Sequence, residues 1–246
     1  MELSFLADTM GKLLAGVPLT LNLSFVSILL GAMLAVVLAL LRAGFAPAAW
    51  LVRFYVYVLR GTPLLLQLFL IYYGVGQFAW IRNSVLWPFL REPYWCAILA
   101  LSLNTAAYGS EIIRGGLQSV PSGAIEAARV SGMSGALLYR RIVLPLAIRQ
   151  ALPAYGNEII SMVKATSLAS IVTLMEVSGI SYAIISETYR ALEVFLCAGV
   201  IYLAINFLLT RAVAWLEYRL NPHLRAQRAS AKPIGDSPAG RNKHRY

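Results

Sequence analysis

Polar side chains follow helical spacing inside two otherwise apolar stretches of the sequence. Asn104, Tyr108 and Glu111 are spaced i, i+4 and i+7, so they share one face of a helix. The second stretch repeats this spacing with a carboxylate beside it, in Asn157, Ser161, Lys164 and Glu158. No His or Cys lies near these carboxylates to complete a catalytic set, so the pattern favours ligand binding over covalent chemistry.

The composition places these stretches in a lipid bilayer. Of 246 residues, 59% are hydrophobic and only 13% are charged, and the mean hydropathy is +0.68. The formal charge of +10 could suggest nucleic-acid binding, but the basic residues collect between the apolar runs. Nucleic acid is therefore not expected as a partner. Cys96 and Cys197 lie in separate apolar runs and supply neither a disulfide framework nor a metal cluster.

Five membrane-spanning helices are expected, because a helix needs about 20 mostly apolar residues to cross a bilayer. Four charge-free runs cover residues 13–41, 61–81, 93–110 and 194–210. A fifth, at about 151–175, contains Glu158 and Lys164, whose charges are costly inside a span. The predicted fold is an all-α integral membrane protein. It has an external segment over 1–16, a transmembrane domain over 17–216 and a basic, disordered tail over 217–246.

The distribution of basic residues predicts how the spans are oriented. Counted on alternate sides of five spans, fifteen Lys and Arg residues lie on the side of the carboxyl terminus and four on the other. Cytoplasmic loops carry the excess of basic residues, so the amino terminus is predicted to be periplasmic and the carboxyl terminus cytoplasmic. A surface of anionic lipid could hold the basic tail.

The cytoplasmic loop over residues 114–150 is expected to contain two short helices. Pro121 and Ser122 are typical of a helix start, with Ser122 as the cap. Gly132 is expected to end this helix, because glycine enters the left-handed conformation at little cost. A second helical pattern, over 136–148, is expected to bend at Pro145.

This loop resembles that of the membrane subunits of bacterial ATP-binding-cassette importers. The signature of that superfamily is Glu-Ala-Ala, three residues, Gly, nine residues, Ile, one residue and Leu-Pro. The matching residues here are Glu126, Ala127, Ala128, Gly132, Ile142, Leu144 and Pro145. Segments similar to the polar amino-acid branch are Arg60-Gly61-Thr62-Pro63, Ser110-Glu111-Ile112 and residues 114–121, 152–158 and 164–168. The similarity is greatest to permeases for histidine, basic amino acids and opines.

The resemblance implies a permease subunit in the bacterial inner membrane that performs no catalysis itself. The helix over 124–132 would be a coupling helix that sits in a cleft of the ATPase subunit. The implied partners are two copies of a cytoplasmic ATP-binding subunit, a paralogous second permease, a periplasmic substrate-binding protein and membrane lipid. The chain lacks a P-loop motif, so ATP must bind to another chain. His223 and His244 lie in the tail, and neither a metal nor a cofactor is expected.

A zwitterionic or cationic amino acid needs a carboxylate for its positive group and donors for its own carboxylate. Under this resemblance Glu158 and Asn157 meet those needs, and Asn104 and Tyr108 extend the polar lining. These residues are the candidates for substrate binding.

Two charged residues in or near the spans have alternative roles. Lys164 either binds the substrate carboxylate or pairs with a carboxylate such as Glu111. Glu111 is expected to reach the cytoplasmic interface beside Arg114.

Four further residues bear on how the helices are built and packed. Pro153 and Gly156 favour a kinked or broken start to the fourth span. Tyr202 and Asn206 are expected to form hydrogen bonds between helices.

Two other functions could use a polar membrane interior. An ion-gradient-driven secondary carrier would use Glu158 and Lys164 as proton or ion sites, but the intact Glu-Ala-Ala loop argues against it. A membrane-embedded enzyme is disfavoured because the intramembrane carboxylates lack catalytic neighbours.

Overall fold

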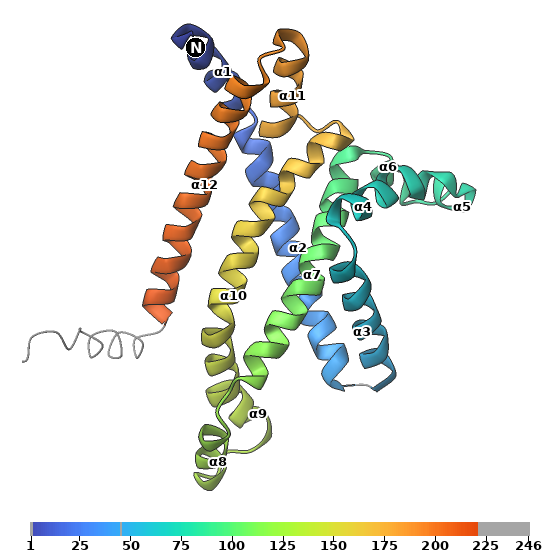
Figure 1. Ribbon diagram of the computed structural model, residues 1–246. Helices are drawn as coiled ribbons and strands as arrows, with labels where there is room; N and C mark the ends of the chain where they lie inside the picture. Colours follow the sequence, from blue (N-terminus) through green and yellow to red (C-terminus); the bar gives the residue numbers. More distant parts are fainter. Residues whose placement is uncertain (1, 45, 221–246) are drawn as a thin grey trace, which may run out of the picture.

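The computed structural model describes residues 2–44 and 46–220, and every regular element within them is a helix (Figure 1). Three helices are long and apolar enough to span a membrane, namely Leu3–Gly44, Pro93–Gln118 and Ala191–Leu220. The number of candidate spans rises to five if each of two bent helix pairs is one span. The expected all-α membrane fold is confirmed. Most of the predicted tail lies outside the described residues.

Helices α2 (Val17–Gly44) and α7 (Pro93–Gln118) pack side by side at the centre of the bundle (Figure 1). Their backbones approach closely at two glycines. A Cβ atom on Gly31 would lie 2.5 Å from Cγ2 of Thr105, and one on Gly109 would lie 2.9 Å from Cβ of Ala35. Small residues allow such contacts in membranes, where the hydrophobic effect does not drive helices together.

The second span differs from the single run predicted over 61–81. Helix α3 (Ala46–Gly61) is followed by α4 (Leu64–Phe69) and the turns up to Gln77, at a bend of 106°. Pro63 explains the break, because it has no N–H to donate and disfavours helix at the residue before it. Arg53 and Arg60 are two of the fifteen basic residues predicted to lie in loops on the side of the carboxyl terminus, and the structure places both on helix α3.

Helices α5 (Ala79–Arg82) and α6 (Trp87–Leu90) follow this bent segment. They extend sideways from the bundle (Figure 1). Trp80 and Phe89 are exposed on them. Aromatic side chains of this kind are favoured where membrane meets water.

The loop predicted over 114–150 is shorter in the structure. Helix α7 continues to Gln118, and α8 (Ser122–Val130) is followed by α9 (Gly135–Leu138). A π-helical turn over Tyr139–Val143 then leads into α10 (Leu144–Ala165). Pro145 is the second residue of α10, directly after the π turn, where its missing N–H is tolerated. The bend expected at Pro145 stays a prediction.

The break expected as one possibility near Pro153 and Gly156 is absent, since α10 runs through both residues, and the alternative of a kink there stays a prediction. Gly156 instead allows close packing against α12 (Ala191–Leu220), where a Cβ atom would lie 2.3 Å from Cγ1 of Val213. Beyond α10, a 3-10 segment ends near Thr173, whose φ of 67° is left-handed. The chain then turns by 46° into α11 (Val177–Thr188).

The segment predicted over 1–16 as an external extension is mostly helical. Helix α1 (Leu3–Leu14) packs against α11 and α12. Leu13, Val177 and Val194 are fully buried where these helices meet. The segment is thus an integral part of the helical bundle.

Candidate functional site

Glu158 of α10 faces α7 rather than the outer surface of the bundle. Thr105 donates a hydrogen bond from Oγ1 to Oε1 of Glu158 over 3.0 Å. Arg60, in the last turn of α3, is close enough for its positive charge to attract the Glu158 carboxylate. Three helices thus converge on this carboxylate.

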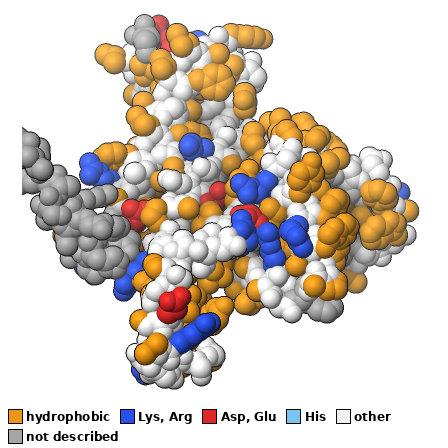
Figure 2. All heavy atoms as spheres, turned by 60° about the horizontal axis from the view of Figure 1, so that its bottom comes forward, with side chains coloured by type: hydrophobic (Ala, Val, Ile, Leu, Met, Phe, Trp, Pro, Cys, Tyr) orange, Lys and Arg blue, Asp and Glu red, His pale blue; other side chains and the backbone are white. Residues whose placement is uncertain are grey.

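A hollow of about 470 Å³ opens between α3 and α7, and Arg60, the neighbour of Glu158, lines it. The guanidinium carbon of Arg60 lies 4.8 Å from the centre of the Tyr108 ring, which is cation–π geometry. The lining consists of Arg53, Val56, Tyr57, Arg60, Gly61, Tyr108 and Glu111. Figure 2 shows basic side chains gathered around carboxylates on this face of the molecule.

Glu111 is neutralised by two arginines. It pairs with Arg42 of α2 and with Arg114, whose Nη2 lies 2.6 Å from Oε2 of Glu111. The expected position beside Arg114 is confirmed, whereas the alternative pairing of Lys164 with Glu111 is wrong. The pair with Arg42 joins the last turn of α2 to α7, whereas the pair with Arg114 lies within α7.

Asn104 donates hydrogen bonds at the bend between α3 and α4. Pro63 cannot donate to the carbonyl oxygen of Leu59, four residues earlier. Gln67 supplies that donor over 2.8 Å, and Asn104 approaches the same carbonyl at 3.4 Å. Asn104 also donates to Oε1 of Gln67 over 3.0 Å. Its amide therefore satisfies protein groups at an irregular stretch of membrane backbone.

Asn157 and Lys164 lie on a different face of α10 from Glu158. Both are exposed, as is Ser161 between them, so the predicted stripe exists. Neither Asn157 nor Lys164 makes a side-chain hydrogen bond or ion pair with another described residue. Glu158 and Tyr108 share Arg60 as a neighbour, whereas Asn157 and Lys164 lie on the exposed face of α10.

The Glu-Ala-Ala loop has the expected corner at Gly132, with a φ of 80°. Gly132 donates to the carbonyl of Arg129 over 2.9 Å and Met133 to that of Ala128 over 3.0 Å, which is a Schellman motif. Ser122 is not the cap, because it is the first residue of α8 and Pro121 precedes it without a side-chain capping bond.

Some residues of the signature are packed in the core of this loop, and others are exposed. Ala128 is buried, and Ile142 packs partly against the same cluster as Val143. Glu126 and Ala127 are exposed on the outer face of α8. The remaining signature residues are Leu144, which is exposed, and Pro145, which is half-buried.

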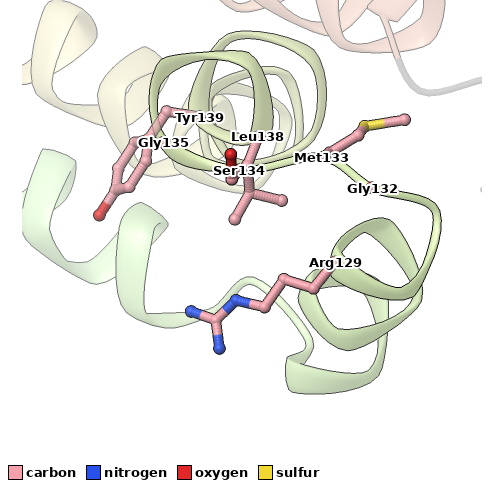
Figure 3. A pocket seen from close by; sticks show the side chains of 7 residues that line it. All are labelled: Arg129, Gly132, Met133, Ser134, Gly135, Leu138 and Tyr139. Atoms are coloured by element: carbon pink, nitrogen blue, oxygen red, sulfur yellow. The ribbon is translucent and has the colours of Figure 1, made fainter.

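Between α8 and α9 the corner encloses an open hollow of about 450 Å³ (Figure 3). Figure 3 shows Arg129 reaching across it from α8 towards Leu138, with Tyr139 on the opposite side. The hollow forms part of the surface that α8 and α9 present at one end of the molecule (Figure 1).

Sequence reasoning missed the buried carboxylate of Glu176. This side chain is fully buried at the start of α11. It accepts hydrogen bonds from the Tyr202 hydroxyl over 2.6 Å and the Gly179 N–H over 2.9 Å, and Thr20 lies 3.5 Å away. Glu176 therefore links α2, α11 and α12.

The hydrogen bond to Glu176 confirms the expected interhelical role of Tyr202. Asn206 differs, because its amide donates to the carbonyl of Tyr202 in its own helix. The sequence held one signal for Glu176: an acidic residue directly before a helix that starts with small residues can act as its cap.

Comparison with known proteins identifies the class. The chain belongs to the family of binding-protein-dependent transport system inner membrane components, whose model matches residues 17–222. It is therefore a multi-pass permease of the inner membrane and a transport subunit, not an enzyme. The family implies an ATP-binding subunit and a substrate-binding protein as partners.

Two permeases of known name and one solved transporter structure are similar to most of this chain. The octopine transport system permease protein OccM of Rhizobium meliloti is 57% identical over 227 residues, which cover 91% of this chain and 92% of that protein. The nopaline transport system permease protein NocM of Agrobacterium fabrum is 53% identical over 235 residues, covering 95% and 98%. A crystal structure of an amino acid ABC transporter with histidines has a TM-score of 0.80 at 31% identity, covering 89% and 99%.

Proposed function

We propose that this permease imports an opine or a basic amino acid across the inner membrane, with octopine or nopaline as the first candidates. The relatives named for these compounds support the substrate class. The observation that carries the proposal is Glu158, a carboxylate that accepts a hydrogen bond from Thr105 and lies near Arg60, which lines an open hollow. It would bind the guanidinium or ammonium group of the substrate. Tyr108 contributes to the same site.

Asn157 and Lys164 would meet the substrate on the exposed face of α10. Ionisable residues in spans face a cavity or a partner rather than lipid. In the assembled transporter we place a paralogous second permease against this face. The polar stripe would then line the path between the two permeases.

The ATPase would act on the permease through its contact with α8. Its exposed Glu126 and Ala127 would sit in a cleft of the ATPase, and two copies of that subunit would serve the permease pair. In Figure 1 this end of the molecule lies opposite the amino terminus. This supports a periplasmic amino terminus and a cytoplasmic coupling loop, with a substrate-binding protein docking at the periplasmic end.

The test is Glu158→Gln in the complete transporter, reconstituted with its ATPase, second permease and binding protein. Glutamine keeps the size of the side chain but removes the charge. A charge-assisted hydrogen bond contributes about 1.5–3 kcal/mol, so octopine uptake should fall about tenfold or more. The matched control is Glu92→Gln, which removes an exposed carboxylate beside Arg91.

Assembly with the ATPase should survive in both variants. Loss of the assembled complex in Glu158→Gln would show that this carboxylate is structural. Unchanged uptake by an assembled Glu158→Gln transporter would remove the residue from the site.

A further inference from the structure

We propose that the hollow between α3 and α7 binds the carboxylates of a conjugated amino acid, with Arg60 taking the α-carboxylate and Arg53 the additional one. The inference rests on the proposed function and names the groups that would distinguish an opine from its parent amino acid. Arg53 and Arg60 were not recognised as site residues from the sequence.

The residues that line the hollow from α3 form one face of that helix. Arg53, Tyr57 and Arg60 are spaced i, i+4 and i+7, and all three are exposed. A rise of 1.5 Å per residue places Arg60 about 10 Å along the helix from Arg53. The face is long enough for a ligand with charges at several points along its length.

The charges of the hollow are unbalanced. Neither Arg53 nor Arg60 forms an ion pair with a residue that the structure describes. Glu111 at the edge of the hollow does not neutralise them, because it already pairs with Arg42 and Arg114. The hollow therefore offers two guanidinium groups without an ion pair among the described residues, of which Arg60 feels the charge of Glu158 and Arg53 has no carboxylate paired with it.

An exposed arginine in a span would be expensive against lipid and is expected to face water or a ligand. Arg53 donates from Nε to the carbonyl of Ala49 over 3.1 Å, which leaves its terminal nitrogens available for an anion. Arg60 lies over the Tyr108 ring, and this contact orients its guanidinium plane. Guanidinium groups bind carboxylates through two parallel hydrogen bonds.

The order of the charges matches an opine of arginine. Octopine carries the guanidinium, aliphatic chain and α-carboxylate of arginine, and a further carboxylate attached through the α-nitrogen. Glu158 would hold the guanidinium, Arg60 the α-carboxylate and Arg53 the further carboxylate. Arginine itself would leave Arg53 without a ligand.

The test measures binding of radiolabelled octopine and radiolabelled arginine to the permease–ATPase complex in nanodiscs, without the binding protein, which would itself bind the labelled ligands. The variants are Arg53→Gln, Arg60→Gln and Arg53→Lys, with Arg82→Gln of α5 as the control. Arg53→Gln should weaken octopine binding about tenfold while leaving arginine binding unchanged. Arg60→Gln should weaken both ligands, and Arg53→Lys should retain part of the octopine affinity because it keeps the charge.

Selective loss of octopine in Arg53→Gln supports the inference. Equal losses of both ligands in that variant, or no loss, would overturn it and leave the proposed function standing. Unchanged octopine binding with loss of co-purified anionic phospholipid would overturn it by showing a lipid headgroup site. If the wild-type transporter binds neither octopine nor arginine, the proposed function fails together with the inference.

Discussion

A few polar side chains hold the helices of this permease in register. Glu176 is the most buried of them and accepts hydrogen bonds at the junction of α2, α11 and α12. A buried charge is costly unless it is paired or hydrogen-bonded, and here the donors come from different helices. Glu176 therefore acts as a structural link rather than as a substrate ligand.

Removal of this link should destabilise the bundle. Tyr202→Phe deletes one hydroxyl and leaves the carboxylate with one donor fewer, which should cost about 1–3 kcal/mol. The matched control is Tyr182→Phe in α11, whose exposed hydroxyl makes no hydrogen bond to another described residue. Thermal unfolding of the detergent-solubilised transporter measures the difference. A Tyr202→Phe transporter that unfolds at the same temperature as the control would contradict this role.

The sequence was informative about polar residues inside predicted spans and less so about those near span ends. Glu158 and Glu111 stand out in apolar surroundings, and both make defined contacts. Glu176 and Arg60 were missed because the predicted spans ended beside them. Burial of Glu176 depends on the 46° turn before α11, which periodicity does not reveal.

The corner at Gly132, directly after α8, depends on the backbone conformation of that residue. Gly132 has a φ of 80°, and a side chain there would meet no other atoms within 4 Å. The penalty for any other residue is therefore conformational rather than steric. The corner sets how α8 projects from the bundle.

Gly132→Pro should uncouple ATP hydrolysis from transport, because proline fixes φ near −65° and cannot adopt this turn. Gly123→Ala is the matched control, since Gly123 lies in α8 with a negative φ and open space around it. Substrate-stimulated ATPase activity of the reconstituted transporter should fall in Gly132→Pro and persist in Gly123→Ala. Normal stimulation in both variants would refute the coupling role.

The close contact between α10 and α12 at Gly156 and Val213 can be tested by substitution. Gly156→Ala places a methyl group against Val213 and should cost about 1–3 kcal/mol by overpacking. Val213→Ala removes the obstructing methyl groups, so the double variant should recover part of the lost thermal stability. Without such recovery, the close contact would not explain the effect of Gly156→Ala.

For the whole molecule, the apolar runs predicted the all-α membrane fold. Where helices bend or pack closely depends on individual prolines and glycines, which composition does not show. Pro63 lies at a 106° bend between α3 and α4, although the apolar run predicted as one span begins only at residue 61, whereas α10 continues as helix through Pro153 and Gly156. The difference lies in the surroundings: Gln67 and Asn104 satisfy the break, and Val213 packs over Gly156.

The orientation proposed for the whole chain predicts where its carboxyl terminus lies. A reporter that is active only in the cytoplasm should be active when fused after Tyr246. The reason is the excess of basic residues on that side, although Arg53 and Arg60 belong to α3 and drop out of the loop count. Activity of a periplasm-only reporter at the same position would invert the topology.

Uptake into sealed right-side-out vesicles that contain the complete transporter distinguishes an ATP-driven importer from a secondary carrier. Labelled octopine should enter right-side-out vesicles only when the binding protein is outside and ATP is on the cytoplasmic face, and an imposed proton gradient without ATP should drive none. Uptake driven by the proton gradient alone, without ATP or binding protein, would contradict an ATP-driven importer and indicate a secondary carrier.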